Sequence, residues 1–529
     1  MVSEAADAFG SKAAKLGAVL GIASRGRVLT VGETPWQDDL ISHFPRLERV
    51  GSESELQGCF DSGATYDLIL WRSGGEQVVA PLSDWGARMR DSLKRSGSLL
   101  VFADNPIAPR RLRAPWRHLK ALLSPGLPGT RRALVAGGFN RIEEYLVHPR
   151  IETASDFVHL RRGGDRNRVM IPLHRRWLGR LGIARWLHDG FLLVASGGEG
   201  GFQTFLSQAE ARSRASSRSR GGGDWVIERF CLRARGALVG ILGPSCRENR
   251  ARVVSRVTTT GPAQKMVAHN FRWIGRFHAA PRIPTELKRV VPEPLFEIEM
   301  DDYAAFFETA IEGAMAFEVI QNAEVERKVF EGCYRFIRDF NESTATRMRV
   351  TPEFFARLAP SPSGPWIDEE MRRLISDLRG LLFQRAGEQE RTVVWAHRDF
   401  HYGNAMVDPE SGTLRGIIDW ERAGQDFAGV DLLELVIRRE RLVNSATLIE
   451  ALRRHAPSFV AGGFRGIDEG LDYEDRFPLN PELRRERLGW LVWRATERAT
   501  LYPAVYRAAP EAHRAVAGWA CMLLATSSQ

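Results

Sequence analysis

The chain has 529 residues, of which 44% are hydrophobic and 26% are charged. This length exceeds what one ordinary hydrophobic core organises, so we expect two or three domains of globular composition. No apolar run approaches the ~20 residues that span a bilayer, which predicts a cytoplasmic protein without membrane insertion.

The formal net charge of +9 comes from arginine-rich sequence spread along the chain. No stripe of Lys and Arg with interleaved aromatic residues stands out, so we expect no nucleic-acid partner. The five cysteines are dispersed and none forms CxxC, which indicates reduced thiols and not a disulfide framework or a zinc site. Nothing in the sequence indicates an oligomeric state.

Four short apolar runs dominate the first two hundred residues. Turn residues bound these runs, which are typical of strands covered on both faces by helices. They lie at Arg27–Gly32, Tyr66–Trp71, Gly97–Ala103 and Gly190–Ala195. The sequence therefore predicts an open α/β sheet.

The segments RVLTVG, YDLIL, SGSLLVFADNP and ALVAGGFNRIEEYLVHP occur in an order that resembles a degenerate class I S-adenosylmethionine-dependent methyltransferase, over residues 15–207. The resemblance implies a Rossmann-like parallel sheet, with S-adenosylmethionine as a possible cofactor. The family's glycine-rich loop keeps only Gly32, which Glu33, Thr34, Pro35 and Trp36 follow. Such bulky residues and a proline would obstruct close approach of a cofactor.

Residues 208–223, QAEARSRASSRSRGGG, are predicted to be a flexible linker. Small, polar and glycine residues bury too little apolar surface to order themselves. This linker would divide the chain into domains at 15–207 and 224–529.

The part after the linker begins with strand-like segments at Trp225–Arg233, Ala237–Leu242 and Ala251–Thr259. A helix is predicted from Ala263 to His278. After Glu308 the pattern becomes mostly helical, interrupted by one hairpin. This order predicts a small β-rich lobe followed by a larger helical lobe.

The hairpin places three polar side chains close together. Its strands are predicted at 405–408 and 413–418, with a turn at Pro409-Glu410-Ser411-Gly412. Antiparallel pairing brings Asn404 and Asp419 to the open end of the hairpin, and Asp399 lies on the loop that leads in. Mg²⁺ prefers oxygen ligands and keeps several waters, so Asn404 and Asp419 suit it, while Asp399 can accept or orient a hydroxyl proton. The three residues predict metal-dependent phosphoryl transfer.

The motif HRDFHYGN followed by IIDWE resembles the catalytic and metal-binding segments of the aminoglycoside phosphotransferase and choline kinase family, which has a protein-kinase-like fold. The resemblance covers residues 224–529 and implies an α+β domain with lobes at 224–312 and 313–529. It implies that Asp399 is the catalytic base or the residue that orients the hydroxyl, and that Asn404 and Asp419 bind Mg²⁺. It also implies ATP or GTP as phosphoryl donor and a structural role for Asp431.

The same resemblance assigns nucleotide-binding residues. Arg256 falls where the family has a strand lysine that holds the phosphates, and arginine keeps the charge while changing geometry and reach. The segment Phe307–Gly313 resembles the hinge that binds adenine through its backbone, at Glu308 and Ala310. Arg398 stands where the family usually has glycine.

The leading hypothesis is an ATP- or GTP- and Mg²⁺-dependent phosphotransferase acting on a hydroxyl of a small molecule, such as a sugar, an amino alcohol or a glycan precursor. One alternative is a bifunctional methyltransferase–kinase. Another is a catalytically silent, nucleotide-binding regulatory or scaffold protein.

Overall fold

The computed structural model describes residues 12–526 except 24, 33, 74–81, 105–125, 149–155, 161–189, 197–199, 216–224, 233–236, 245–251, 301–302, 361–366, 469 and 502. The chain forms two compact units. Unit 1 comprises residues 1–268 and 294–310, and unit 2 comprises residues 269–293 and 311–529. Within the described residues, every helix is too short or too polar to cross a membrane.

Unit 1 begins with four parallel strands in the order β2-β1-β3-β4. Their bounds are β1 (Arg27–Val31), β2 (Arg46–Val50), β3 (Tyr66–Ser73) and β4 (Leu93–Asp104). The next strand, β7 (Gly190–Ser196), runs in the opposite direction and pairs antiparallel with β4. On its other side, β7 pairs antiparallel with β5 (Arg141–His148). The predicted α/β sheet is therefore present, but it is mixed and not wholly parallel.

Helices cover both faces of these strands because successive residues of a strand point to opposite faces. Leu68, Leu70 and Leu100 share one core with helices α2 (Lys12–Val19) and α3 (Gln37–His43). Ile69 and Leu99 share the other core with helices α4 (Glu53–Asp61), α5 (Leu82–Ser92) and α8 (Gly126–Ala136). The near-continuous apolar runs of the sequence follow from this two-sided burial.

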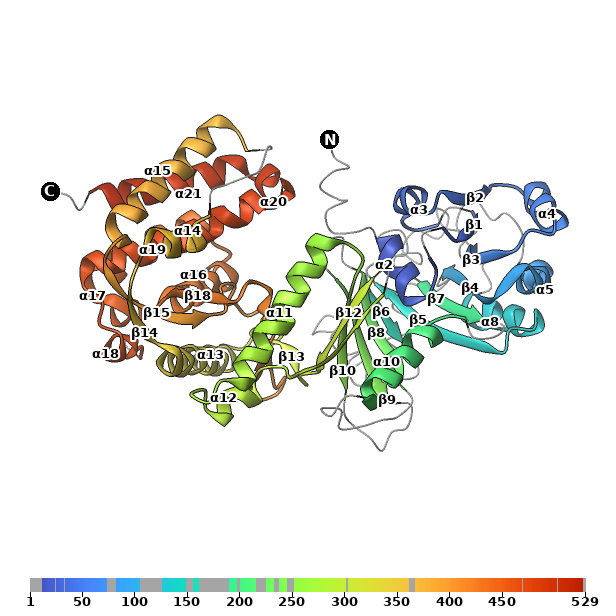
Figure 1. The fold of residues 1–529 in the computed structure, drawn as a ribbon, viewed down its shortest axis with the longest axis horizontal. Coiled ribbons are helices and arrows are strands. Elements are labelled where there is room, and N and C mark those ends of the chain that lie inside the picture. Colours follow the sequence, from blue (N-terminus) through green and yellow to red (C-terminus); the bar gives the residue numbers. More distant parts are fainter. Residues whose placement is uncertain are drawn as a thin grey trace. The chain divides into compact units, whose positions relative to one another are not determined.

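A short strand, β6 (Asp156–His159), continues this sheet into the β-rich segments that follow. It pairs antiparallel with β5 on one side and with β8 (Trp225–Leu232) on the other. Beyond β8 lie β9 (Leu238–Pro244), β10 (Val253–Thr258), β12 (Ala304–Thr309) and β11 (Pro294–Glu299). The result is a single 12-stranded sheet in the order β11-β12-β10-β9-β8-β6-β5-β7-β4-β3-β1-β2 (Figure 1).

The predicted linker is wrong over residues 208–215, which belong to helix α10 (Gln203–Ala215). Phe205, Leu206 and Ala209 of this helix join the same core as α2 and the strands β8 to β12. The Glu210 carboxylate accepts a hydrogen bond from the amide of Trp225 (2.7 Å), which attaches the helix to the start of β8. Residues 216–223 lie outside the described part. The compact units divide after Ala268, not at the predicted linker.

Unit 2 is mainly helical and contains two small antiparallel sheets. One sheet has the order β13-β16-β17, with β13 at Ala314–Met315, β16 at Ala405–Val407 and β17 at Leu414–Ile417. The other has the order β14-β15-β18, with β14 at Thr346–Arg349, β15 at Glu390–Ala396 and β18 at Gly424–Phe427. The predicted hairpin is thus present as β16 and β17.

The helices of unit 2 surround these sheets. Helix α11 (Gly261–Ala279) contains the boundary between the units. The others are α12 (Thr285–Arg289), α13 (Ala323–Thr344), α14 (Pro352–Leu358), α15 (Glu369–Ala386), α16 (Val430–Val443), α17 (Leu448–Ile467), α18 (Tyr473–Arg476), α19 (Pro481–Leu501), α20 (Pro503–Ala508) and α21 (Pro510–Ala525), with short 3₁₀ turns at Ala316–Glu318 and Trp420–Arg422.

Trp420 is a centre of the unit 2 core. Its ring is fully buried and packs against Phe277, Phe340 and His397. The indole Nε1 donates to the carbonyl of Ile417 (2.9 Å), so the polar atom of this large side chain is also satisfied. Trp420 therefore fixes the end of the hairpin to the helical core.

Candidate active site

The open end of the hairpin brings Asn404 and Asp419 together. Ala405 pairs with Ile417, and the amide of Ile418 donates to the carbonyl of Asn404 (2.9 Å). Asp419 is the next residue, with a left-handed backbone conformation at φ 70°. Local backbone hydrogen bonds therefore place the two residues at the same end of the hairpin.

The side chain of Asn404 is oriented by the loop that carries Asp399. Its Nδ2 donates to the carbonyl oxygen of Asp399 (2.9 Å), and it is largely buried. A carbonyl only accepts hydrogen bonds, so the amide nitrogen must be the atom facing it. This leaves Oδ1 as the atom that could bind a cation.

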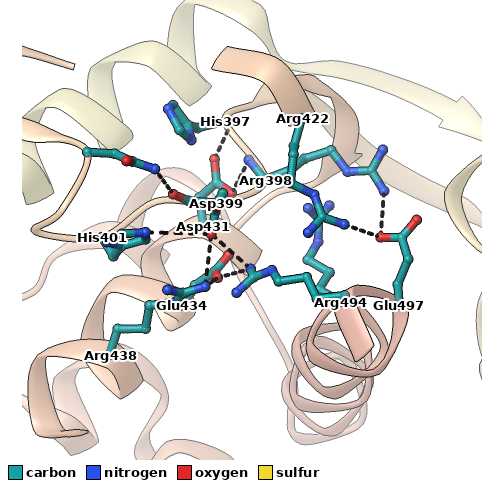
Figure 2. A network of polar contacts seen from close by, with 12 residues as sticks. His397, Arg398, Asp399, His401, Arg422, Asp431, Glu434, Arg438, Arg494 and Glu497 are labelled. Atoms are coloured by element: carbon teal, nitrogen blue, oxygen red, sulfur yellow. Dashed lines mark hydrogen bonds and ion pairs between the residues drawn. The ribbon is translucent and has the colours of Figure 1, made fainter. Parts of the chain in front are cut away.

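Asp431 holds the backbone of the loop that carries Asp399. Its two carboxylate oxygens accept from the amides of His397 (2.6 Å) and Arg398 (3.0 Å), as Figure 2 shows. Burial and the nearby Glu434 raise the pKa of Asp431 to about 7, although the two amides oppose that shift. The structural role predicted for Asp431 agrees with these contacts.

Arg398, which stands where the sequence resemblance leads us to expect glycine, has a left-handed backbone at φ 63°. Such a conformation costs a residue with a Cβ atom roughly 1–2 kcal/mol, which explains the usual glycine. The Asp431 contact to its amide helps to hold this conformation.

His397 braces the loop against the hairpin. Its fully buried ring donates from Nε2 to the carbonyl of Ile418 (3.0 Å). Burial lowers the pKa of His397, so the ring is neutral and its proton lies on Nε2. The contact ties the start of the loop that carries Asp399 to Ile418, the residue before Asp419.

Asp399 is bound by two arginines that the sequence did not predict. Its Oδ1 lies 2.8 Å from Nη2 of Arg438 on α16 and 3.3 Å from Nη2 of Arg498 on α19. The His401 ring lies 3.8 Å from the same oxygen. Burial raises the pKa of Asp399, but the charge of Arg498 and the His401 ring outweigh it, so the pKa is lower than usual. The carboxylate is therefore ionised.

The same two arginines also bind Glu434 on α16, which is fully buried. Arg438 donates from Nε to Glu434 Oε1 at 3.0 Å, and Arg498 contacts the same oxygen. Burial raises the pKa of Glu434. Two guanidinium groups are thus shared between a partly exposed carboxylate and a buried one, as Figure 2 shows for Arg438.

A further set of ion pairs lies next to this network. Glu497 of α19 accepts from Arg422 (3.0 Å) and lies 3.9 Å from Arg398, and Figure 2 shows both contacts. Arg494, one turn earlier on α19, pairs with the buried Asp426. Helix α19 therefore contributes charged side chains to the surroundings of the loop that carries Asp399.

A weak signal for these contacts exists in the sequence. Arg494, Glu497 and Arg498 follow the apolar segment LGWLVW at helical spacing, and Glu434 and Arg438 are four residues apart in an apolar helix. Charged residues on an otherwise apolar helix face must be paired when buried. The spacing indicates such pairing but does not identify Asp399 as a partner.

The predicted nucleotide-binding residues belong to unit 1, whereas Asp399, Asn404 and Asp419 belong to unit 2. Arg256 on β10 donates from Nε to Glu308 Oε1 on β12 (3.1 Å), and both side chains are buried. They lie diagonally across paired strands on one face of the sheet. The amide of Ala310 donates to the carbonyl of Arg252 (3.1 Å).

Within the described ranges, no group of three or more His, Cys, Asp or Glu side chains is arranged to hold a metal ion. Mg²⁺ often takes only one or two protein ligands and completes its shell with water and phosphate oxygens. Asn404 and Asp419 together would supply two such oxygen ligands.

Residues 272–465 match the model of the phosphotransferase enzyme family. The C-terminal part of the chain therefore carries a phosphotransferase-family domain, and Asp399, Asn404 and Asp419 all lie within it. The match does not reach the N-terminal part, where the methyltransferase resemblance remains a prediction. No curated protein matches the chain significantly.

Several solved structures resemble the chain at a distance. A candidate aminoglycoside phosphotransferase of Ralstonia eutropha is 14% identical, with 61% of this chain and 99% of that chain covered and a TM-score of 0.37. An aminoglycoside phosphotransferase of Streptomyces rimosus, solved with ADP and streptomycin, is 15% identical, with coverages of 54% and 96% and a TM-score of 0.33. A choline/ethanolamine kinase family protein of Mesorhizobium loti is 15% identical, with coverages of 61% and 95% and a TM-score of 0.31. Likenesses this distant say nothing about the activity of this chain.

Proposed function

We propose that the protein is a Mg²⁺-dependent phosphotransferase that uses ATP or GTP to phosphorylate a hydroxyl of a small molecule. The observation that carries this proposal is the clustering of Asp399, Asn404 and Asp419. Backbone hydrogen bonds of the hairpin set two of them side by side, and the Asn404 amide bonds to the Asp399 carbonyl. All three lie in the region that matches the phosphotransferase family.

In this proposal Asn404 Oδ1 and the Asp419 carboxylate hold the metal. The fit rests on the Asn404 side chain, whose nitrogen is committed to the Asp399 carbonyl. When bound, Mg²⁺ would neutralise charge on the nucleotide phosphates.

Asp399 is proposed to handle the acceptor hydroxyl. Its carboxylate takes the hydroxyl proton as the acceptor oxygen forms a bond to the terminal phosphorus of the nucleotide. The bond between that phosphorus and the bridging oxygen breaks, and the nucleoside diphosphate leaves with the electron pair. A carboxylate with a lowered pKa serves mainly to orient the hydroxyl and to receive the proton late in the transfer.

Arg256, Glu308 and Ala310 are the proposed nucleotide-binding residues of unit 1. The pairing of Arg256 with Glu308 takes over the anchoring that an acidic helix residue gives the strand lysine in the related sequences. Adenine recognition at Ala310 requires its amide to exchange the bond to Arg252 for one to the base.

The test is release of nucleoside diphosphate by the purified full chain, with and without an acceptor panel. Asp399→Ala and Asp419→Ala are each expected to lower kcat/KM by about 10³-fold or more, because positioning and charge stabilisation supply most of this catalysis. Asp377→Ala is the matched control, since Asp377 is exposed on α15 away from the site. Turnover that survives in both site variants would reject the assignment.

A catalytically silent nucleotide-binding protein is the second candidate. The contacts of Asp399 with Arg438 and Arg498 favour it, because both occupy the oxygen that a hydroxyl would use. Saturable, Mg²⁺-dependent nucleotide binding without turnover on a broad acceptor panel would select this candidate over the enzyme.

A further inference from the structure

A pocket with an unusual charge lies among helices α16, α17 and α19 of unit 2. It is a small pocket of about 30 Å³, within about 330 Å³ of empty space that includes open solvent. Three arginines line it, Arg438, Arg441 and Arg498, together with one acid, Glu434. Most of the remaining lining is aliphatic and includes Leu452 and Leu491.

The pocket adjoins the carboxylate that the proposed function assigns to the acceptor hydroxyl. Arg438 and Arg498 line the pocket and also contact Asp399 Oδ1, at 2.8 and 3.3 Å. A molecule in the pocket would therefore contact the same guanidinium groups that bind Asp399.

The positive charge of this pocket exceeds its negative charge. Glu434 is shared between Arg438 and Arg498. Arg441 is exposed and, among the described residues, forms no ion pair. It lies one turn after Arg438 on α16, so both side chains project from the same side of the helix. An ammonium group would be repelled here, whereas a carboxylate or phosphate would find charge-assisted donors.

We propose that the phosphoryl acceptor is an anionic hydroxyl compound, which carries a carboxylate or phosphate group on a short apolar stem. This inference rests on the proposed phosphotransferase function and adds the chemical class of its substrate. The anionic group binds Arg441 and competes with Asp399 for Arg438 and Arg498. Its arrival thereby frees Asp399 Oδ1 for the hydroxyl of the same molecule. The aliphatic side chains, such as Leu452 and Leu491, contact the stem.

The first test compares four-carbon alcohols whose second terminal group is anionic, cationic or neutral: 4-hydroxybutanoate, 4-aminobutan-1-ol and butane-1,4-diol. Binding to the full chain with Mg²⁺ and ADP is measured by ligand-observed NMR titration. The anion is expected to bind about tenfold more tightly than the diol, and the amine more weakly than either. A fourth probe, 4-hydroxybutyl phosphate, shows whether phosphate or carboxylate is preferred.

Variants assign the preference to the pocket. Arg441→Gln is expected to weaken binding of the anion about tenfold while leaving the diol unaffected, and Arg441→Lys to retain much of the anion's affinity. Arg373→Gln on α15 is the control, because Arg373 is also exposed and does not line the pocket. Equal or tighter binding of the amine, or an Arg441→Gln variant that binds the anion normally, would overturn the inference.

Failure of this inference and failure of the proposed function give different results. Phosphoryl transfer that depends on Asp419 but prefers the amine or the diol leaves the phosphotransferase intact and overturns the anionic acceptor. Anion-selective binding that depends on Arg441, without transfer to any probe or hydrolysis of ATP or GTP, supports the anion site but contradicts the phosphotransferase, and with it the role of the bound anion as acceptor.

Discussion

Two residues at the site have left-handed backbones although neither is glycine. Arg398 has φ 63° and Asp419 has φ 70°. Each conformation costs roughly 1–2 kcal/mol, and such strain persists only where the surroundings fix it. Asp431 accepts a hydrogen bond from the amide of Arg398. The residue after Asp419 is the buried Trp420, whose indole donates to the carbonyl of Ile417. The two strained backbones therefore lie at Asp419 and next to Asp399, two of the residues of the candidate site.

Asp431 makes the stability of the protein depend on pH. Its folded-state pKa of about 7 lies above the unfolded value of about 3.9. The stabilisation from its protonated form is therefore complete below about pH 4 and is lost as the pH rises towards 7, by up to about 1.4 kcal/mol per pH unit.

Asp431→Asn is expected to remove this titration, because the amide stays neutral at every pH. The variant also loses one of the two amide contacts, at about 1–3 kcal/mol. Urea unfolding at pH 5, 6, 7 and 8 should show the largest deficit against the native chain at pH 5 and the smallest at pH 8. A deficit that is constant or grows with pH would mean that Asp431 stays ionised throughout.

At this scale the sequence was sufficient only where the contacts are local. Asn404 and Asp419 are adjacent because a hairpin with a recognisable turn connects them. Arg438 and Arg498 reach Asp399 from helices far along the chain, and only helix packing decides which charged residues meet. Residue spacing alone does not contain that information.

Among the elements, the loop after β1 differs from the glycine-rich loop that the methyltransferase resemblance implies. Gly32 has φ 77°, as a tight turn requires, but Trp36 follows it with φ 61°. The Trp36 ring packs edge-on against Phe102 and Phe157, with ring centroids 5.7 and 5.9 Å apart. A large side chain therefore takes space beside the strand ends, where a glycine-rich loop would leave room.

Titration with S-adenosylmethionine is accordingly expected to give no saturable heat, even at millimolar cofactor. The prediction concerns this cofactor alone. Isothermal titration calorimetry of the full chain is the measurement. Saturable binding that is lost in Gly32→Val would contradict the expectation.

The sequence-based prediction was least accurate for α10, part of which was predicted to be a linker. QAEARSRA is polar in composition, and composition alone predicted a linker. Its few apolar and small residues nevertheless fall on one helix face, where Ala209 and Ser213 are buried. Tertiary burial of that face stabilises a helix that composition does not reveal.

At the scale of the whole chain, the pairing of β6 with β8 joins the N-terminal strands and the strands that follow into one sheet. Phe157 and Phe230 pair across this β6–β8 junction and stack at 4.5 Å, and Arg229 donates from Nε to Asp156 at 2.9 Å. Two sheets that the sequence assigned to separate domains are therefore one, with one core that extends from α2 to β12.

A fragment of residues 224–529 is therefore expected to aggregate or to melt at a lower temperature than the full chain. It retains the whole family-matched region but exposes the edge of β8 and loses α10 from its core. Co-expression of residues 1–215 with residues 216–529 should restore solubility by completing the sheet. Size-exclusion chromatography and thermal melts decide, and a monomeric fragment with the full chain's Tm would show that the junction is dispensable.

The β6–β8 junction also has a consequence for folding of the nascent chain during its synthesis on the ribosome. Strand β6 ends at His159, and its partner begins only at Trp225. At a translation rate of about 5–20 residues per second, β8 is synthesised on the order of seconds after β6. During that interval nascent chains on the same message present identical unpaired backbone to one another, so slower synthesis through this stretch would favour cross-pairing between them.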